Sequence, residues 1–482
     1  MQSNHSFMLV QVHGGALNNL SFTNRVRIFH TNKTVTSETP SFPSLYRRRM
    51  NTTPTVCHVV AVPYPGRGHV NPMINLCKLL ASKKDHIRIT IVVTEEWLGF
   101  IASDPKPHQI SFASIPNVLP SELVRSKNYP EFYDAVMTKM EAPFEELMGR
   151  IQPPVTVIIA DTELLWAIPA GRRRNIPVAS LWTASASVFA TKCEELKMDL
   201  LEDGELKLDQ TGELGELEDP RVIKLAMECI AMVSKANYLL LSSVYELESK
   251  VVDTLRTECT FPVYPIGPAI PYLELECDNG LDYLKWLDSQ PKDSVLYISL
   301  GSYLLVSSTQ MDEFAAGLRK SGIRFLWVAR GESARLKERS GDMGLVVPWC
   351  DQLKVLCHTS VGGFWTHCGW NSTLEAVFAG VPMLTSPLAF DQFPNSWRIV
   401  EEWKIGRQAV KREVEADQDS MTREDIADIV QSFMDLESSD GKEMRKRVKE
   451  LSTLCHGATA KGGSSDKNLD DFIMDITKAA AI

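Results

Sequence analysis

The chain has 482 residues, of which 44% are hydrophobic and 23% are charged, as in ordinary globular proteins. This length predicts two or three domains rather than one. The 61 acidic residues outnumber the 51 lysines and arginines and give a formal net charge of −10. Such a charge argues against nucleic acid or an anionic membrane surface as a partner.

Ten cysteines occur without a Cys-x-x-Cys pair and without a spacing typical of zinc ligands. In so long a chain we interpret them as free, mostly buried thiols of a reducing compartment, and we expect a cytoplasmic protein. No apolar run approaches the roughly 20 residues that span a bilayer, so no transmembrane anchor is expected. We expect the chain to act as a monomer.

Residues 1–53 are predicted to be an N-terminal extension outside the fold. The first 50 residues hold one acidic residue, Glu38, against several basic ones, including the run Arg47-Arg48-Arg49. That composition is typical of an organelle transit peptide. The alternative, which we favour, is that the true start is Met50. In either case we expect the extension to be disordered or absent from the mature protein.

From residue 56 onward, short apolar runs alternate with amphipathic helical stretches, which is typical of doubly wound parallel sheets. An acidic, Leu-rich insertion at 194–219 interrupts the alternation, and a linker at 266–280 separates two halves. The halves predict two Rossmann-like domains, 54–265 and 281–460, that face a central cleft. A C-terminal helix, 461–482, is expected to pack back on the first domain. The predicted strands are 56–63, 87–93, 155–160, 176–182, 238–242, 295–300, 324–329, 345–347, 361–366 and 381–385.

His69 lies in the segment PYPGRGHVNP, directly after the first predicted strand. Gly66 and Gly68 shape a turn there, and Asn71 and Pro72 fit the N-cap and the first position of the next helix. We therefore expect His69 at the carboxyl end of a strand, facing the cleft, where it suits a general base. A lone histidine is more often structural, so its sequence context alone leaves both roles open.

Asp161 follows the apolar run VTVIIA, in the same position at the end of a predicted parallel strand. A carboxylate there has the same topological position as His69. It can equally serve as the N-cap of a helix that begins in DTELLWAI.

Residues 349–392, which begin WCDQ and end FDQ, combine the parts of an anion site. The apolar run VGGFWT predicts a buried strand, after which Gly369 permits a sharp turn. A helix is expected to open at Asn371, with Ser372 and Glu375 in the spacing of a capping box. Unpaired N–H groups at such a helix start favour a phosphate.

Groups at the two ends of this stretch suit the rest of a nucleotide sugar. Trp349 offers a flat face to a planar ring, and Asp391 and Gln392 offer polar groups to a polyol. Phosphate, ring and polyol together predict a nucleotide-sugar site.

The same 44 residues resemble the signature box of the plant secondary-product UDP-glycosyltransferases, the inverting enzymes of family 1. The core FWTHCGWNSTLEA and the closing DQ carry the resemblance. The opening Trp-Cys-Asp-Gln and the late AKGGSSDKN resemble one small group within that family. Asp351 departs from the proline that the family usually has. The resemblance implies the GT-B fold from about Cys57 to the C-terminus.

The resemblance also implies a role for individual residues. His69 would be the base, activated by Asp161, and UDP would leave from the opposite face of the sugar. Gln392 at the end of the box is typical of glucose donors, and no metal or cofactor beyond the UDP-sugar is expected. The implied donor contacts are Ser302, His367, Asn371 and Ser372 for the phosphates, Trp349, Gln352 and Glu375 for the uridine, and Trp370, Asp391 and Gln392 for the sugar.

The implied function is UDP-glucose-dependent O-glycosylation of a small apolar or aromatic acceptor, such as a phenolic, flavonoid or hormone-like metabolite. Loops of the first half should build the acceptor pocket, with aromatic residues such as Phe132, Tyr133 and Phe144. The sequence does not name the acceptor. One alternative is a UDP-sugar-binding regulatory protein without turnover, which the presence of both His69 and Asp161 disfavours. Another is a nicotinamide dehydrogenase, but PGRGHVNP lacks the third glycine of that motif.

Overall fold

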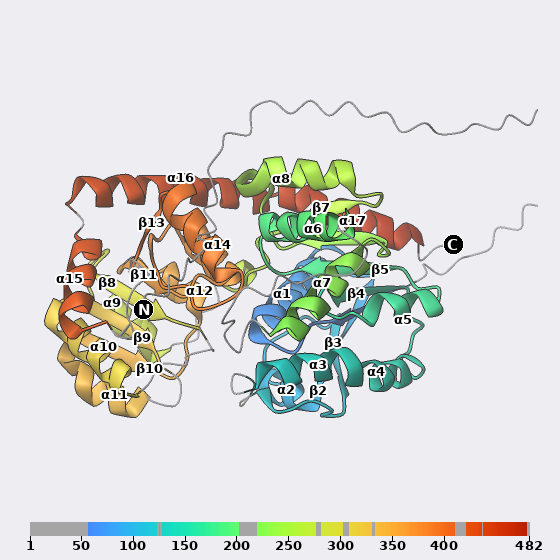
Figure 1. Cartoon of the computed structure of the whole chain (residues 1–482), viewed down its shortest axis with the longest axis horizontal. Coiled ribbons are helices and arrows are strands. Elements are labelled where there is room, and N and C mark those ends of the chain that lie inside the picture. Colours follow the sequence, from blue (N-terminus) through green and yellow to red (C-terminus); the bar gives the residue numbers. More distant parts are fainter. Residues whose placement is uncertain are drawn as a thin grey trace, which may run out of the picture. The chain divides into compact units, whose positions relative to one another are not determined.

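The computed structural model describes residues 56–122, 125, 128–201, 219–275, 281–301, 308–329, 333–409, 421–435 and 437–479. The N-terminal extension predicted for 1–53, most of the acidic insertion and part of the linker lie outside the described residues. Within them the chain forms two parallel sheets covered by helices (Figure 1).

The first sheet has seven parallel strands in the order β3-β2-β1-β4-β5-β6-β7. Val59 of β1 pairs with Ile89 of β2 on one side and with Val157 of β4 on the other. The strand order therefore reverses between β1 and β4, and their carboxyl ends form the switch point where ligands bind in such sheets. The strands are β1 (Cys57–Val62), β2 (Ile87–Thr94), β3 (Ile110–Ile115), β4 (Val157–Asp161), β5 (Val178–Trp182), β6 (Tyr238–Leu241) and β7 (Val263–Pro265).

The second sheet has six parallel strands in the order β10-β9-β8-β11-β12-β13. Its order reverses between β8 and β11, where Trp365 pairs with Ile298. This second switch point lies within the stretch of 349–392 described above, because β11 is part of that stretch. The strands are β8 (Val295–Ser299), β9 (Arg324–Val328), β10 (Gly344–Val347), β11 (Val361–Thr366), β12 (Met383–Thr385) and β13 (Gly406–Gln408).

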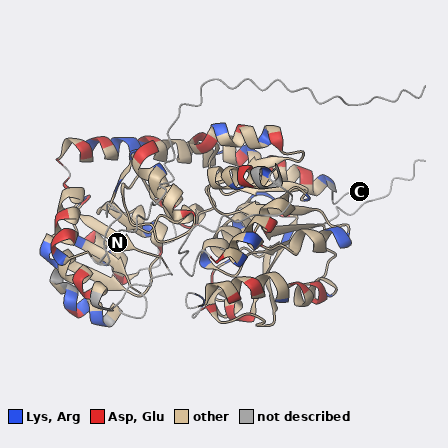
Figure 2. Cartoon of the chain, in the orientation of Figure 1, with Lys and Arg blue, Asp and Glu red and all other residues tan. Residues whose placement is uncertain are grey.

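Helices connect the strands of both sheets. In the first half they are α1 (Arg67–Lys83), α2 (Glu95–Ile101), α3 (Tyr129–Lys139), α4 (Glu141–Met148), α5 (Ala167–Arg173), α6 (Ala186–Leu201), α7 (Pro220–Val233) and α8 (Tyr245–Glu258). In the second half they are α9 (Asp282–Asp288), α10 (Ser308–Ser321), α11 (Ser333–Ser340), α12 (Gln352–Leu356), α13 (Trp370–Ala379), α14 (Gln392–Trp397), α15 (Arg423–Met434) and α16 (Ser439–Thr459). Lysines and arginines are interspersed with aspartates and glutamates over both halves (Figure 2).

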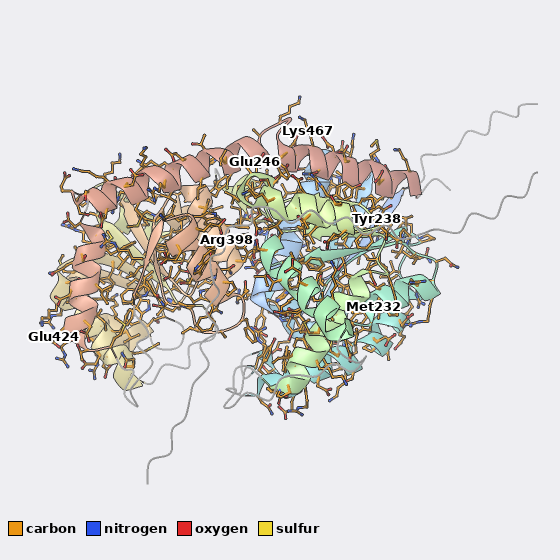
Figure 3. The ribbon with its side chains drawn as sticks, turned by 45° about the horizontal axis from the view of Figure 1, so that its top comes forward. Met232, Tyr238, Glu246, Arg398, Glu424 and Lys467 are labelled. Atoms are coloured by element: carbon orange, nitrogen blue, oxygen red, sulfur yellow. The ribbon has the colours of Figure 1, made fainter. Side chains whose placement is uncertain are left out.

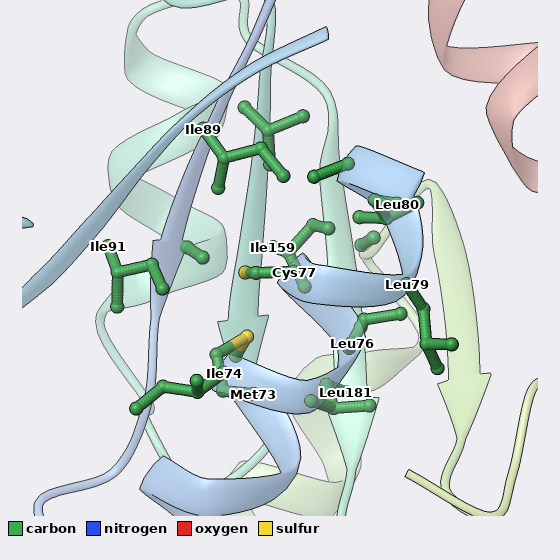
Figure 4. Close-up of a cluster of buried hydrophobic side chains, with 14 of the residues drawn as sticks. Met73, Ile74, Leu76, Cys77, Leu79, Leu80, Ile89, Ile91, Ile159 and Leu181 are labelled. Carbon is green, nitrogen blue, oxygen red and sulfur yellow. The ribbon is translucent and has the colours of Figure 1, made fainter. Parts of the chain in front are cut away.

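Helix α1 is fixed to the first sheet by a fully buried apolar face. Met73, Leu76 and Leu80 recur at helical spacing and pack, with no exposed surface, against side chains such as Ile159 and Leu181 (Figure 4). Truncating one of these leucines to alanine would cost about 2–5 kcal/mol. This packing fixes α1 to the sheet, with its first turn at the carboxyl edge.

The C-terminal helix α17 (Ser464–Ala479) packs on the first sheet, whereas α16, which precedes it, belongs to the core of the second. Phe472 and Ile476 of α17 are fully buried in the same cluster as α1. The Tyr264 hydroxyl of β7 donates to Asp475 Oδ2 at 2.6 Å, and Lys83 of α1 pairs with Asp466. The end of the chain thus holds the two halves to each other.

All ten predicted strands are present, with ends that agree to within two residues, and the expected pair of Rossmann-like sheets is confirmed. Three strands are missing from the prediction, β3, β7 and β13. Strand β3 is an edge strand with half-exposed residues, so its sequence ISFASI lacks a clean alternation. The other two have only three residues each, and β7 ends in a proline.

Candidate active site

The histidine expected to act as a base lies in the first turn of α1. The helix begins at Arg67 with Gly66 as its N-cap, so the prediction that Asn71 caps it and Pro72 opens it is wrong. The amides of His69 and Val70 already donate to the Gly66 carbonyl at 2.9 and 2.8 Å, and the helix therefore starts at the glycine turn itself. His69 still lies directly beyond the carboxyl end of β1, as expected.

His69 and Asp161 meet at the switch point of the first sheet. Asp161 is the last residue of β4, is only 3% exposed, and places Oδ2 2.9 Å from His69 Nδ1. The hydroxyl of Thr183, just beyond β5, lies 3.1 Å from the same nitrogen. Asp161 Oδ1 accepts the amide N–H of Glu163 at 3.0 Å, whereas α5 begins only at Ala167. The alternative role of Asp161 as a helix N-cap is therefore wrong.

The electrostatics of this pair favour a strong base. Burial alone would lower the pKa of His69, but the charge and the hydrogen bond of Asp161 outweigh it and raise the pKa to about 9. The nearby Glu163 carboxylate acts in the same direction, and the Arg125 guanidinium acts against it. Because Nδ1 faces Asp161, Nε2 is the nitrogen that a substrate in the cavity can reach.

The helix that opens the predicted anion site, α13, begins at Trp370 with Gly369 as its N-cap and no side-chain cap. The predicted capping box is wrong, because this earlier start places Ser372 and Glu375 inside the helix. Both instead accept hydrogen bonds from the Gln352 side-chain amide. No side chain of the described residues caps the first-turn N–H groups of α13, as an anion site requires.

The turn before α13 differs from its prediction in detail. Its left-handed residue is Cys368, with φ 66°, whereas Gly369 has φ −58°. The Cys368 N–H donates to Thr366 Oγ1 at 3.1 Å, and its carbonyl accepts from Asn395 at 3.0 Å, which holds the unusual conformation. Gly369 is needed for close approach instead, since a Cβ there would lie 2.7 Å from His367 Nε2.

Two glycines allow the close packing of the His367 ring. A Cβ on Gly301 would lie 2.9 Å from the imidazole, and a Cβ on Gly369 would lie as close to the same ring. Burial lowers the pKa of His367 to about 4. The ring is therefore neutral near pH 7 and is available as a hydrogen-bonding group rather than as a positive charge.

The next two residues connect the second half to the first. The indole N–H of Trp370 donates to the Ser242 carbonyl at 2.7 Å, so the side chain is engaged in the core. The side-chain amide of Asn371 donates to the Gly68 carbonyl at 2.7 Å. Pro72, four residues beyond Gly68, has no N–H to bond that carbonyl within α1, which leaves it free for Asn371. Asn371 Oδ1 is buried and has no partner among the described residues.

The flat face expected from Trp349 is available, because this side chain is 55% exposed at the edge of the cavity. The neighbouring Asp351, which replaces the usual proline, is the N-cap of α12. Its carboxylate accepts from the Lys354 amide at 3.3 Å, and its own N–H donates to the Tyr283 hydroxyl at 2.9 Å. A proline could make neither bond, so the departure has a local structural role.

Gln352 and Glu375 lie together beside that segment. Gln352 accepts a hydrogen bond from the Tyr297 hydroxyl at 3.1 Å and donates to Ser372 Oγ at 2.9 Å. Burial raises the pKa of Glu375 to about 7, although the bond from Gln352 opposes this. A buried carboxylate with one neutral partner favours further hydrogen-bond donors, such as hydroxyl groups.

The closing pair of the stretch lies at the start of α14. Gln392 Oε1 accepts hydrogen bonds from the backbone amides of Leu388 and Ala389, at 2.8 and 3.1 Å, and so fixes the loop before α14. The side-chain nitrogen of Gln392 can donate to a ligand. Asp391 Oδ2 accepts from Asn395 at 2.9 Å, and burial raises the pKa of Asp391.

A single cavity of about 1,710 Å³ brings these residues together. That volume exceeds the roughly 300–1,000 Å³ of a site for one drug-sized ligand and leaves room for two. Ser302 lies outside the described residues. The predicted site residues that line the cavity are His69, Asp161, Trp349, Gln352, His367, Trp370, Asn371, Ser372, Glu375, Asp391 and Gln392.

The expected aromatic acceptor residues are only partly placed as predicted. Tyr133 lines the cavity, but Phe132 and Phe144 are buried in the core of the first half, because they lie on the sheet side of α3 and α4. The cavity wall instead includes Tyr64 and Phe390, which the sequence analysis does not single out.

Thr183 and Glu163 were also missed. Both lie at carboxyl ends of parallel strands, beyond β5 and β4, and the rule that selected Asp161 applies to them equally. The sequence does not show which side chain at the end of a strand points into the cavity.

Comparison with known proteins identifies the family. Residues 231–461 match the family model described as UDP-glucoronosyl and UDP-glucosyl transferase. Over 443 residues the chain is 49% identical to UDP-glycosyltransferase 87A1 of Arabidopsis thaliana, an alignment that covers 86% of this chain and 100% of that one. The chain belongs to the plant UDP-glycosyltransferases of family 1. It is 48% identical over 442 residues to UDP-glycosyltransferase 87A2 of the same plant, covering 87% of this chain and 97% of that one.

Among solved structures, Phytolacca americana UGT2 complexed with UDP-2fluoro-glucose and pterostilbene is similar with a TM-score of 0.71. The identity is 28%, and the match covers 87% of this chain and all of that one. The GT-B fold is therefore confirmed. This UDP-glycosyltransferase is an enzyme that transfers a sugar to small molecules. The comparisons support neither of the alternatives, a regulatory protein without turnover or a nicotinamide dehydrogenase.

No helix in the described part of this UDP-glycosyltransferase is both long and apolar enough to cross a bilayer. No three His, Cys, Asp or Glu side chains among the described residues are grouped so that they could hold a metal ion.

Proposed function

We propose that this UDP-glycosyltransferase transfers glucose from UDP-glucose to a hydroxyl group of a phenolic, flavonoid or hormone-like plant metabolite, with inversion at the anomeric carbon. The observation that carries the proposal is the His69–Asp161 contact of 2.9 Å in a cavity that also holds the uncapped start of α13. A base and an anion site in one cavity are what a displacement of UDP by a hydroxyl requires.

In this mechanism His69 Nε2 removes the proton of the acceptor hydroxyl as its oxygen bonds to the anomeric carbon. The bond from that carbon to the β-phosphate oxygen breaks, and the electron pair leaves with UDP. Asp161 holds the imidazole through Nδ1 and stabilises the imidazolium that forms. The raised pKa of His69 makes it a stronger base than a free imidazole.

The charge of the leaving diphosphate falls on fixed donors. We assign the phosphates to the first-turn amides of α13, His367, Asn371 and Ser372, and assign Ser302 to the same group by resemblance. The side-chain amide of Asn371 has a second N–H besides the one that bonds the Gly68 carbonyl, and this N–H can donate to a phosphate oxygen. With these donors the proposed transfer does not call for a metal ion or another cofactor.

The remaining contacts are assigned to the uracil, the ribose and the sugar of the donor in turn. The exposed face of Trp349 supports stacking on the uracil, and Glu375, with Gln352, suits the ribose hydroxyls. The backbone of Trp370 and the side chains of Asp391 and Gln392 would contact the sugar. Glucose is proposed from Gln392, and the name of the Phytolacca americana complex, which contains UDP-2fluoro-glucose, supports a glucose-type donor.

We also propose a cytoplasmic, monomeric enzyme. The nine cysteines among the described residues are all free, which supports a reducing compartment. Asn371, in the formal glycosylation sequence Asn-Ser-Thr, faces the cavity and bonds the Gly68 carbonyl, so a glycan there would block the site.

The test is product analysis with the purified protein, several UDP-sugars and a panel of phenolic, flavonoid and hormone-like acceptors. We expect UDP-glucose to give a β-glucoside, detected by mass and by the coupling constant of the anomeric proton. A different preferred sugar would overturn the donor assignment, and an α-glucoside would overturn the single displacement. Failure to bind any UDP-sugar would contradict the proposal as a whole.

A further inference from the structure

Beside the proposed catalytic pair, the cavity wall holds a buried phenol that the transfer does not use. The ring of Tyr64 lies 4.9 Å from the His69 ring and 5.8 Å from the Tyr133 ring. Tyr64 is only 2% exposed, and its hydroxyl has no hydrogen-bond partner among the described residues. Since the great majority of buried polar groups are hydrogen-bonded, this hydroxyl points to a ligand group that would complete it.

A carboxylate lies in the same part of the wall. Glu163 follows β4, and the bond from its amide to Asp161 Oδ1 fixes the turn that brings it to the cavity. Among the described residues none forms a hydrogen bond or ion pair with its carboxylate. Burial raises the pKa of Glu163. Its amide bonds Asp161, Asp161 bonds His69, and the His69 ring lies against the Tyr64 ring, so Glu163 and Tyr64 line the same part of the cavity.

The chemistry of the two groups limits what can bind between them. A carboxylate only accepts hydrogen bonds, whereas a tyrosine hydroxyl can donate one. A ligand hydroxyl satisfies both, because it donates to Glu163 and accepts from Tyr64. The surrounding wall is aromatic: Tyr129 lies 5.7 Å from Tyr133 and 5.4 Å from Phe390, which suits a planar ring.

We propose that Glu163 and Tyr64 form a second polar subsite in the acceptor part of the cavity, which binds a hydroxyl group other than the one that is glycosylated. The acceptor class is then an aromatic compound with at least two hydroxyl groups. This inference rests on the proposed function, which places the acceptor beside His69.

Two of the cations that line the cavity act on this subsite, Lys192 on Glu163 and Arg125 on Tyr64. Arg125 is paired with Glu122 at 3.1 Å and donates to the Pro65 carbonyl, so its charge is already engaged. Lys192 also lines the cavity and acts on both Glu163 and Asp391. If Lys192 rather than Glu163 bound the second polar group of the ligand, a ligand carboxylate would bind more tightly than a ligand hydroxyl.

The test is calorimetric binding of matched naphthols to the full chain saturated with UDP. The compounds are 2-naphthol, its 2,3-, 2,6- and 2,7-dihydroxy analogues, and 6-hydroxy-2-naphthoic acid. We expect at least one diol to bind about tenfold more tightly than 2-naphthol, as one charge-assisted hydrogen bond allows. Tyr64→Phe, which removes only the hydroxyl, and Glu163→Gln should each reduce that advantage severalfold. Tyr238→Phe and Glu228→Gln, outside the cavity, should leave it unchanged.

Two results would overturn the subsite. One is an equal affinity of 2-naphthol and all three diols, or an advantage that survives in both cavity variants. The other is tighter binding of the naphthoic acid than of every diol, which would assign the region to Lys192. Unchanged affinity for UDP shows that each variant is folded. Turnover is measured separately with UDP-glucose, so a failure of the proposed transfer is distinguished from a failure of the subsite.

Discussion

At the residue scale, the chemistry depends on a carboxylate that sets the basicity of one imidazole. Asp161 is the main reason that the pKa of His69 is raised to about 9. A general base works in its neutral form, so activity should increase with pH until His69 has lost its proton. Asp161 thus makes His69 a stronger base, but it also lowers the fraction of His69 that is unprotonated at neutral pH.

Replacing Asp161 by asparagine should separate these two effects. Without the negative charge the pKa of His69 falls, so the acidic limb of the kcat/KM profile moves to lower pH. The maximum rate should fall by about 100-fold or more, because the imidazolium is no longer stabilised. A profile between pH 6 and 10 for both proteins measures the shift. An acidic limb that stays at the same pH would mean that Asp161 does not control His69.

The residue scale also shows where prediction from sequence succeeds. Motifs predict His69, Asp161 and the site residues within 349–392, and all of these line one cavity. Details of backbone conformation were not accessible in the same way. Cys368 rather than Gly369 takes the left-handed conformation. Hydrogen bonds with Thr366 and Asn395 hold it there, and Asn395 is too far along the chain for a local pattern to reveal that contact.

At the element scale, the starts of helices carry much of the site, and they were the least predictable feature. Both α1 and α13 begin earlier than their apparent capping residues suggest, each at a glycine. The side chains that resemble caps, Ser372 and Glu375, instead contact Gln352. Tertiary contacts of this kind override local capping patterns, which record only what is favourable in an isolated helix.

The N-cap of α12 gives a prediction about stability. Replacing Asp351 by alanine should lower the free energy of unfolding by about 1 kcal/mol, since the Lys354 amide loses its partner. Asparagine, which can accept the same bond, is the matched control and should retain most of the stability. Chemical denaturation of the three proteins measures the difference. Equal losses in both variants would show that the charge, and not the cap, is what matters.

At the scale of the whole molecule, the two halves are joined by a buried ion pair. Glu248 of α8 has a fully buried side chain and pairs with Arg398, which begins the π-helical turn 398–402 and lies between the elements of the two halves (Figure 3). Glu248 also accepts bonds from Ser187 and Ser243. Arg398 is therefore only one of several groups that stabilise the Glu248 carboxylate.

Breaking this pair should be costly. Arg398→Met leaves the Glu248 carboxylate buried without its cation and is expected to destabilise the protein by about 3–5 kcal/mol. Adding Glu248→Gln to that variant should recover part of the loss, because the uncompensated charge is removed. Thermal or denaturant unfolding of the single and double variants measures this. If the double variant is no more stable than the single one, the buried charge is not the cause.

The architecture of the molecule was the part most open to prediction. Buried parallel strands such as VGGFWT are continuous apolar runs, and they stand out in any sequence. The short edge strands β7 and β13 carry too little apolar pattern to be seen alone, and their pairing partners supply the missing information. How the chain crosses from α16 to α17 and returns to the first sheet also depends on contacts, such as Tyr264 with Asp475, that no local pattern records.

The central claim is that His69 removes the acceptor proton in a transfer from a UDP-sugar. The most direct measurement is acceptor-dependent release of UDP from UDP-glucose by the unmodified protein and by His69→Ala, with the affinity for UDP measured alongside. We predict that the variant binds UDP as before but releases it at least 100-fold more slowly, because base catalysis is lost and the α13 site remains. Undiminished UDP release by His69→Ala would contradict the account.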